Sequence, residues 1–240
     1  MRHAYALWDL VHLPDRVRFV SAVRDDATVG YLLIWLGRPA RPVVHWFGPV
    51  PEASILARAL PPRPFVAVVP EEACPTVLGE RGAAEAHSVL LLLRERGPSG
   101  DRAPRSGVRR LTRADRPALE AWARRGADPV VSEYASGDPD AEHVWGAFEN
   151  EELVGIAGAS VRLPTIWVVA GVYVEPSVRR RGVARSVVSA AIEAAETAGA
   201  RVGLYAREDA HPARRLYEGL GFGVVGRQAW LDFGGVAGPG

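Results

Sequence analysis

Apolar residues recur at spacings of three and four between positions 183 and 198, and this periodicity predicts the clearest helix of the chain. The apolar face would be formed by Ala184, Val187, Val188, Ala191 and Ala195. Gly199 follows directly and supplies a typical helix stop. Such a one-sided apolar face has to be buried, so the sequence predicts that this helix packs against a hydrophobic core.

Other segments of the second half show the patterns of strands and turns. An apolar run at 165–175 predicts a long strand ended by Pro176. Asp209 is expected to cap a helix with Pro212 in its first turn and Gly221 as its terminator. The remaining expectations are strands near 108–111, 143–149, 153–162, 202–206, 222–226 and 228–233, a helix at 114–125, and irregular structure at 127–140.

In the first half of the chain, the pattern of apolar residues predicts a mixture of strands and helices. Short apolar runs bounded by Gly or Pro indicate strands at 32–36, 43–47, 64–69 and 89–93. Helices are expected near 14–25, 51–60 and 72–84. The polar segment 97–107, rich in Gly and Pro, separates the two halves. We therefore expect a domain at 1–97, a linker at 98–106 and a domain at 107–240.

Composition removes several classes of function. All 29 basic residues are arginines, so Schiff-base chemistry on lysine and a P-loop with its lysine are excluded. A net charge of +1 does not favour a nucleic-acid partner. The single cysteine, Cys74, excludes an internal disulfide and a cysteine zinc site, and no metal site is expected. The chain has no stretch of about 18 apolar residues, so no membrane partner is expected. A cytoplasmic location fits best.

Candidate chemistry lies between the strand at 165–175 and the helix at 183–198. Here the chain contains the pattern Arg-x-x-Gly-x-Ala at Arg179, Gly182 and Ala184. A loop that leaves a strand and opens a helix presents unpaired backbone N–H groups, and these favour an anion. Gly182 would let a diphosphate approach the backbone. The alternative is a solvated basic loop with a helix cap.

A second pattern, Ala-x-x-Leu-Tyr-x-x-x-Gly-Phe, follows at 213–222. With the loop, it resembles the GNAT superfamily of acyl-CoA-dependent N-acetyltransferases over roughly residues 107–233. The resemblance implies an α/β (α+β) fold with a mixed, mostly antiparallel central sheet flanked by helices. Segments 43–50, 51–60 and 65–69 repeat the order seen around the loop, so the first half is interpreted as a degenerate copy in a tandem arrangement.

The resemblance also implies roles for individual residues, with acetyl-CoA as the cosubstrate. Backbone groups of Val172, Tyr173 and Val174 would bind the pantetheine arm. Tyr217 matches the tyrosine that protonates the departing thiolate in many members. His211 stands where the family often has Asn. The diphosphate would be held by the backbone amides of Arg180, Arg181, Gly182, Val183, Ala184 and Arg185, with Arg179 opening the motif.

The family's general base has no counterpart on the strand, because residues 166–171 contain no acid. Glu175 lies at the strand end beside Pro176. A base from elsewhere or an amine that binds already neutral are both open. The candidates are Glu133, Tyr134, Glu142 and Asp209, each with the alternative of a solvated surface residue.

The leading interpretation is transfer of an acetyl or short acyl group to a primary amine of a small molecule or peptide. A strand amide, that of Val174, would stabilise the oxyanion. A catalytically silent acyl-CoA-binding regulatory module is the rival, and a protein-modifying enzyme is the third interpretation. The first half is expected not to bind CoA but to wall off the acceptor pocket. A homodimer is left open.

Overall fold

The computed structural model describes residues 1, 3–37, 41–49, 53–62, 64–82, 84–95, 107–126, 128–137 and 143–234. The expected linker at 98–106 lies outside these residues. Packing divides the chain into two compact units. Unit 1 comprises Met1, Leu92–Tyr205 and His211–Val224, and unit 2 comprises Arg2–Leu91, Ala206–Ala210 and Val225–Gly240. The expected domain boundaries stay a prediction.

Unit 1 is built on a mixed, mostly antiparallel sheet. Its strands are β6 (Val108–Arg110), β7 (Val144–Glu149), β8 (Glu152–Leu163), β9 (Ile166–Val174) and β10 (Arg201–Arg207). They lie in the order β10-β9-β8-β7-β6, with β9 and β10 parallel and the other neighbours antiparallel. The parallel pair is the only one that needs a crossover, and helix α7 (Val183–Thr197) supplies it.

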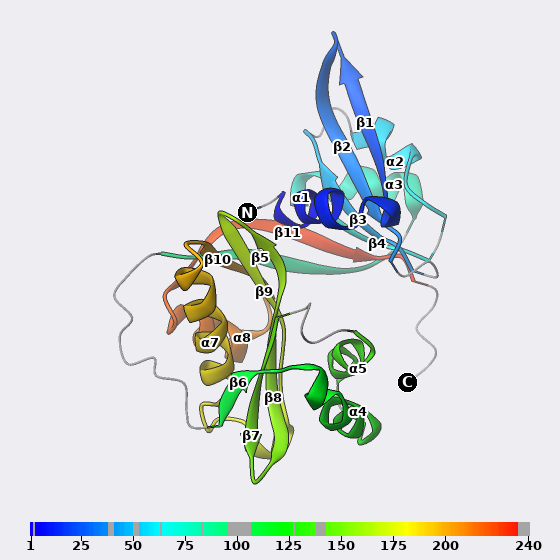
Figure 1. Ribbon diagram of the computed structural model, residues 1–240. Coiled ribbons are helices and arrows are strands. Elements are labelled where there is room, and N and C mark those ends of the chain that lie inside the picture. Colours follow the sequence, from blue (N-terminus) through cyan, green and yellow to red (C-terminus); the bar gives the residue numbers. More distant parts are fainter. Residues whose placement is uncertain are drawn as a thin grey trace. The chain divides into compact units, whose positions relative to one another are not determined.

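Helices cover the sheet of unit 1 (Figure 1). Helix α7 packs against β7, β8 and β9, while α4 (Arg116–Arg124) contacts β8 and α5 (Pro129–Ser136) contacts β9. The helix that the periodicity at 183–198 predicts is thus present as α7, and its apolar face is buried. A second core forms beneath α4 and α5, from Leu111, Leu119, Trp122, Val131, Ala135, Val144, Leu153 and Ile156. Helix α8 (His211–Glu218) follows β10.

Two expectations for the second half of the chain are wrong. Segment 127–140 was expected to be irregular, yet it contains α5. The Asp128 carboxylate accepts the N–H of Val130 at 3.0 Å, and Pro129 occupies the first turn, so residues that suggest a loop in fact begin a helix. The two strands expected at 222–226 and 228–233 are one continuous strand, β11 (Phe222–Asp232).

In unit 2 the strands lie in the order β1-β2-β3-β4-β11. Strands β1 (Val17–Arg24), β2 (Ala27–Trp35) and β3 (Val43–Phe47) are antiparallel neighbours, and β4 (Val66–Val69) is parallel to β3. Helices α2 (Ala53–Arg58) and α3 (Cys74–Arg81) pack together, and Trp46, Phe65, Leu231 and Phe233 join them in the core. Strand β5 (Glu85–Arg94) has residues in both units.

The prediction of a helix near 14–25 is also wrong. The segment contains the short 3-10 helix η1 (Pro14–Arg16) and then β1, while helix α1 (Ala4–His12) precedes them. Asp25 and Asp26 both have positive φ, of 49° and 60°, and form the tight turn between β1 and β2. This hairpin turn, with the β-branched residues before it, favours a strand over a helix.

The two units repeat one order of elements. In unit 2, an antiparallel strand, β3, α2, β4 and α3 follow one another, and unit 1 repeats this order with β8, β9, α7, β10 and α8. The last strand of the chain completes unit 2, because β11 pairs with β4 through Ala229 and Val69. The repeat therefore lies in topology, whereas unit 2 is not contiguous in sequence.

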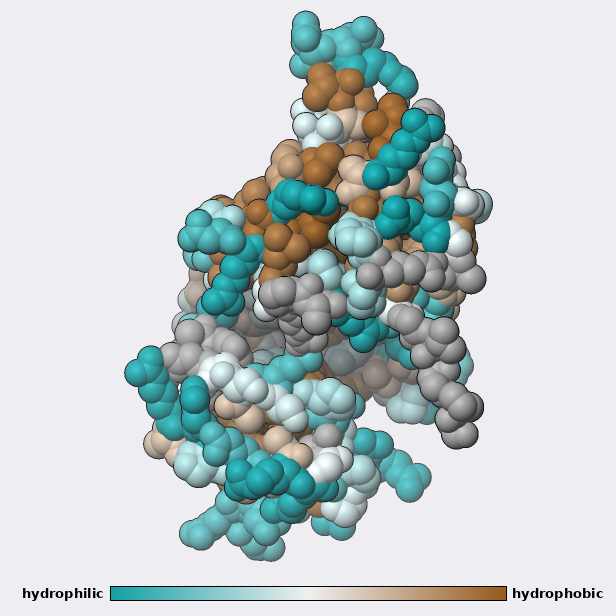
Figure 2. Space-filling model, turned by 90° about the vertical axis from the view of Figure 1, so that its right-hand side faces the viewer, coloured by the Kyte–Doolittle hydropathy of each residue, from teal (hydrophilic) through white to brown (hydrophobic). Residues whose placement is uncertain are grey.

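Large hydrophobic side chains are exposed on unit 2. Leu7, Leu10 and Val11 lie on α1, and Phe19 and Val23 lie on β1. Figure 2 shows hydrophobic side chains gathered in the upper part of that view. None of the described helices combines the length and apolar character needed to cross a bilayer.

Candidate functional site

The parallel strands β9 and β10 pair only at one end. Their register runs from Ile166 and Arg201 to Val169 and Leu204, whereas β9 continues to Val174. Beyond Val169 the edge of β9 that faces β10 therefore has no ladder partner in this pairing. The two strands therefore separate beyond Val169, and this leaves backbone donors and acceptors of β9 available to an extended ligand.

A β-bulge interrupts β9 where the strands separate. In the register with β8, Ile156 pairs with Tyr173 and Gly158 with Ala170, so Gly171 and Val172 together face one residue of β8. Gly171 has φ +62°, a conformation that favours glycine. A bulge re-aims the backbone of the residues around it, and here these are the residues expected to bind the pantetheine arm.

The loop after β9 ends in an uncapped helix N-terminus. Gly182 is the N-cap of α7 with φ 84°, and no described side chain caps it. The N–H of Ser186 donates to the Gly182 carbonyl at 3.1 Å, which leaves the amides of residues 183–185 ahead of the first helical hydrogen bond. Arg180 also has positive φ, of 63°. The amides and the helix dipole together favour an anion at this point.

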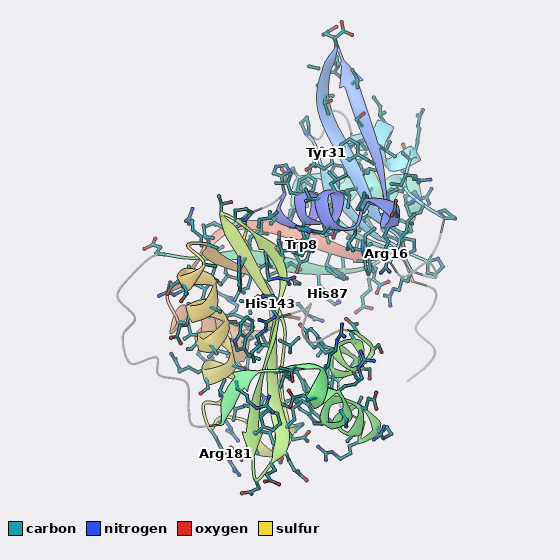
Figure 3. The ribbon with its side chains drawn as sticks, viewed as in Figure 1. Trp8, Arg16, Tyr31, His87, His143 and Arg181 are labelled. Atoms are coloured by element: carbon teal, nitrogen blue, oxygen red, sulfur yellow. The ribbon has the colours of Figure 1, made fainter. Side chains whose placement is uncertain are left out.

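The arginine side chains around the loop have different partners. Arg179 Nε donates to the Val174 carbonyl at 3.0 Å, and its guanidinium lies over the Tyr173 ring at 5.7 Å. Arg181 lies 3.8 Å from Glu149, and Figure 3 labels it. Arg185 donates to the Gly219 carbonyl at 3.0 Å, linking α7 to the end of α8. Arg179 thus fixes the loop to β9, and its neighbours add positive charge.

Tyr217 lies on α8 and is buried, with 7% of its surface exposed. Its ring meets Phe222 edge-on at 6.0 Å. Burial raises its pKa to about 12, so the phenol stays protonated at neutral pH. His211 begins the same helix and is exposed. The structure therefore offers a protonated hydroxyl on the helix that contains the second sequence pattern.

The acids proposed as general base lie in different surroundings. Glu175, at the strand end and not one of these candidates, accepts the indole N–H of Trp122 at 2.7 Å. Asp209 pairs with Arg207 at 2.6 Å, and this partner lowers the pKa of its carboxyl, so it is a weaker base. Glu133 is exposed on α5, and Glu142 lies outside the described residues.

Tyr134 is the remaining candidate, and it has a structural partner. Its hydroxyl donates to the Ala170 carbonyl at 3.2 Å, beside the bulge of β9. Sequence reasoning named this residue for its chemistry, but its place over the bulge depends on α5, which the sequence pattern did not reveal.

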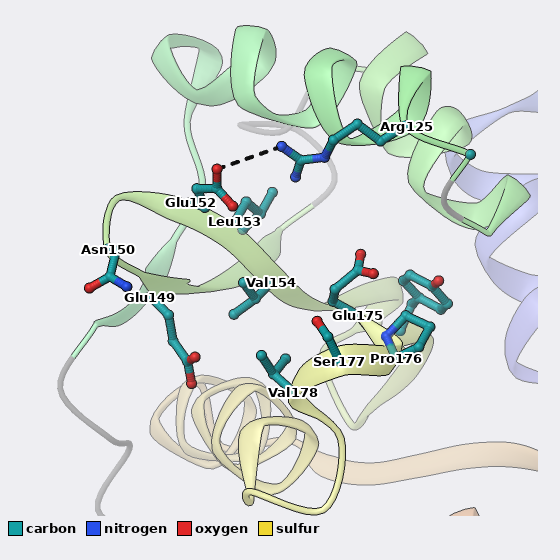
Figure 4. Close-up of a pocket in the computed structure, with 12 residues that line it drawn as sticks. Arg125, Glu149, Asn150, Glu152, Leu153, Val154, Glu175, Pro176, Ser177 and Val178 are labelled. Carbon is teal, nitrogen blue, oxygen red and sulfur yellow. Dashed lines mark ion pairs between the residues drawn. The ribbon is translucent and has the colours of Figure 1, made fainter.

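A cavity of about 800 Å³ lies within unit 1 at the end of β9 (Figure 4). Glu149, Glu152 and Glu175 contribute carboxylates to its wall, and Arg125 lies 3.9 Å from Glu152. The sequence signal for this wall is the segment 149–152, which has three acids in four residues. The other residues that line this cavity are Gly126, Asn150, Leu153, Val154, Tyr173, Pro176, Ser177 and Val178.

Comparisons with known proteins agree with this geometry. A model of the acetyltransferase (GNAT) family matches residues 107–222. No curated protein matches the sequence significantly.

Solved structures that resemble the chain include three acetyltransferase-type proteins. A GCN5-related N-acetyltransferase from Sphaerobacter thermophilus is 15% identical, with TM-score 0.65 over 92% of this chain and 82% of its own. One from Kribbella flavida is 21% identical, with TM-score 0.60 over 98% and 96%. A tandem GNAT protein from the clavulanic acid biosynthesis pathway is 16% identical, with TM-score 0.62 over 97% and 88%.

At these identities the likeness shows the fold, and the family follows from the match to residues 107–222 together with the loop, the strand separation and α8. Residues 107–222 of this chain therefore form an acetyltransferase domain of the GNAT family.

Proposed function

We propose that this protein transfers an acetyl or short acyl group from acyl-CoA to a primary amine of a small molecule or peptide. The observation that supports this most is the uncapped N-terminus of α7 beside the separated ends of β9 and β10. The two features together provide an anion site and a strand edge, which are the two things that the diphosphate and the pantetheine of CoA require.

In this proposal the backbone amides of residues 180–185 hold the diphosphate. Because these donors belong to the backbone, a chain without lysine loses nothing at this site. Arg179 contributes by tying the loop to Val174, and Arg180, Arg181 and Arg185 add a positive field. The backbone of Val172, Tyr173 and Val174 would pair with the pantetheine arm.

Acyl transfer then needs an oxyanion donor and an acid. A backbone N–H near the end of β9, that of Val174 in our proposal, would stabilise the negative charge on the thioester oxygen. Tyr217 would protonate the departing thiolate. A phenol with a pKa near 12 donates only if the thiolate forms in the same water-poor surroundings, since a free thiol has a pKa near 8.5.

The amine acceptor would approach the end of β9, where the carboxylates of Glu149, Glu152 and Glu175 favour a cationic molecule. Residues 166–171 hold no acid, so either an acid of this wall removes the proton through water or a fraction of neutral amine reacts.

Thiol release from acetyl-CoA, followed with a chromogenic thiol reagent over a panel of polyamines, amino acids and peptides, tests the proposal. Turnover with at least one amine, with the acylated amine seen by mass spectrometry, supports it. Binding of acetyl-CoA without turnover on any acceptor would favour the rival, a regulatory module that binds acyl-CoA. The absence of an acid on β9 is what keeps this rival open. Acylation of peptides alone would favour a protein-modifying enzyme.

We further propose that the chain is a tandem protein in which unit 2 is a degenerate copy that binds no CoA. The repeated order of elements supports this. Calorimetric titration of the full chain should then give one acetyl-CoA per chain, and two would contradict it. A cytoplasmic location, a wall around the acceptor pocket formed by the first half, and assembly as a homodimer stay predictions.

A further inference from the structure

Unit 2 contains a cavity of about 290 Å³ at the ends of its parallel strands. The pairing of β3 and β4 ends at His45 and Val68, and the cavity wall begins just beyond it. The wall contains Trp46 and Phe47 at the end of β3, Gly48 and Pro49 directly after it, and Pro70 and Glu72 from the segment that follows β4. Ligands of open sheets with parallel strands bind outside the carboxyl ends of those strands. The cavity is thus where a ligand of unit 2 is expected.

The cavity lies on the face of the sheet that α1 covers. Phe47 packs with Ala6 of α1, whereas its neighbour Trp46 packs into the core beneath α2 and α3. Ala229 and Leu231 of β11 also belong to that core, so strand alternation places Gln228 on the face of Phe47. Three elements therefore meet at one small space.

Gln228 is a largely buried polar side chain that lines this cavity. Its exposed fraction is 3%, and within the described residues its amide makes no hydrogen bond. Because the described residues do not occupy its hydrogen-bonding groups, the amide is available to a molecule in the cavity. An amide both donates and accepts, and it suits a polar ligand.

The N-terminus of α1 lies at the wall of this cavity. His3 is its N-cap and lines the cavity, and no described side chain caps the helix. The first amide with a helical acceptor is that of Leu7, which donates to the His3 carbonyl at 2.9 Å. The His3 ring is held by stacking on Phe47 at 4.3 Å and by the Tyr31 hydroxyl at 2.5 Å; Figure 3 labels Tyr31. An uncapped first turn favours a carboxylate.

Glu72 adds the opposite charge to the wall, and Phe47, Pro49 and Pro70 add apolar surface. We propose that this cavity is a second ligand site, one that binds a free amino acid. The carboxylate of the ligand lies at the α1 N-terminus and Gln228, its ammonium faces Glu72, and its side chain contacts the apolar wall. The volume is at the lower end of the roughly 300–1,000 Å³ of ligand pockets, so it suits an amino acid and not acyl-CoA.

The test uses the full chain with L-alanine, L-leucine and propionate as probes, in thermal unfolding and in calorimetric titration. We expect L-alanine or L-leucine to raise Tm and to bind at millimolar concentration or tighter, and propionate to bind at least tenfold more weakly. Gln228→Leu should abolish the response, since it removes the amide that would bind the carboxylate of the ligand. Glu72→Gln should weaken the amino acids but not propionate.

Acetyl-CoA binding should be unchanged in both variants, which shows that they fold and separates this site from the proposed acyl-transfer function. An absence of binding by both amino acids would overturn the proposal. An undiminished response in Gln228→Leu, or equal binding of propionate and L-alanine, would overturn it as well.

Discussion

The hydroxyl of Tyr134 on α5 donates a hydrogen bond to the carbonyl of Ala170 on β9, at 3.2 Å. The hydroxyl lies between two glycines: a Cβ at Gly158 or at Gly171 would collide with it. Gly171 is the residue with positive φ in the bulge. The absence of side chains on both strands thus makes room for Tyr134, and α5 holds β9 in its bulged form next to the proposed acyl site.

Tyr134→Phe should lower kcat about three- to tenfold and reduce the free energy of unfolding by about 1 kcal/mol, because one hydrogen bond to the bulge is lost. If Tyr134 were instead the general base, kcat would fall by about 10²- to 10⁴-fold. Steady-state kinetics with acetyl-CoA and urea unfolding of the same preparation separate the two. An unchanged kcat and stability would show that the hydroxyl does not hold the bulge.

The sequence predicted the elements around the loop well because each has a local signal. The helix at 183–198 has a periodic apolar face, and Pro176 and Gly182 mark where the strand ends and the helix begins. By contrast, α5 begins with Asp128 and Pro129, which are equally typical of turns, and only packing on Leu111 and Ile156 decides for a helix. Local patterns do not contain that information.

The candidate site also has one part that could be predicted from the sequence and another that could not. Backbone donors at Gly182 follow from sequence order alone, so they could be predicted. The cavity wall joins Arg125 to Glu152 and Glu175, residues from three separate segments, and its formation depends on how α4 meets β8 and β9. The pairing of β11 with β4 could not be predicted either, because the apolar pattern of a strand does not identify the strand with which it pairs.

Gly182→Ala should raise KM for acetyl-CoA about tenfold or more, with a smaller change in kcat. Its φ of 84° strains any residue with a Cβ, and the methyl group would stand at the proposed diphosphate site. Gly199→Ala is the matched control, since Gly199 has φ +78° with nothing within 4 Å of an added Cβ. It should lose stability without losing affinity for CoA. Equal KM values for the two variants would argue against a diphosphate at Gly182.

Asp9 should make unit 2 less stable as the pH rises. Burial raises the pKa of this carboxyl to about 7, from an ordinary value near 3.8. Between these values the unfolded chain ionises Asp9 while the folded chain keeps it protonated, so stability is full below about pH 4 and falls until about pH 7. Asp9→Asn should be the more stable protein above pH 7 and should lose this advantage near pH 4.

Urea unfolding of the wild type and Asp9→Asn at several pH values measures the difference directly, so groups common to both proteins cancel. One such group is His45, whose pKa burial lowers to about 4, and which costs stability as the pH falls from about 6.5. A difference between the two proteins that stays constant from pH 4 to pH 8 would contradict the raised pKa of Asp9.

Tyr217→Phe should lower kcat by about 10²- to 10⁴-fold while leaving the Kd for acetyl-CoA nearly unchanged, since an acid acts on the departing thiolate and not on the bound ground state. With its pKa raised to about 12, wild-type Tyr217 stays protonated, so kcat should show no loss of this acid between pH 7 and pH 10. Tyr205→Phe is the control: its hydroxyl, on β10, donates to the Met1 carbonyl at 3.4 Å. A kcat for Tyr217→Phe close to that of Tyr205→Phe would remove Tyr217 as the acid and leave solvent to protonate the thiolate.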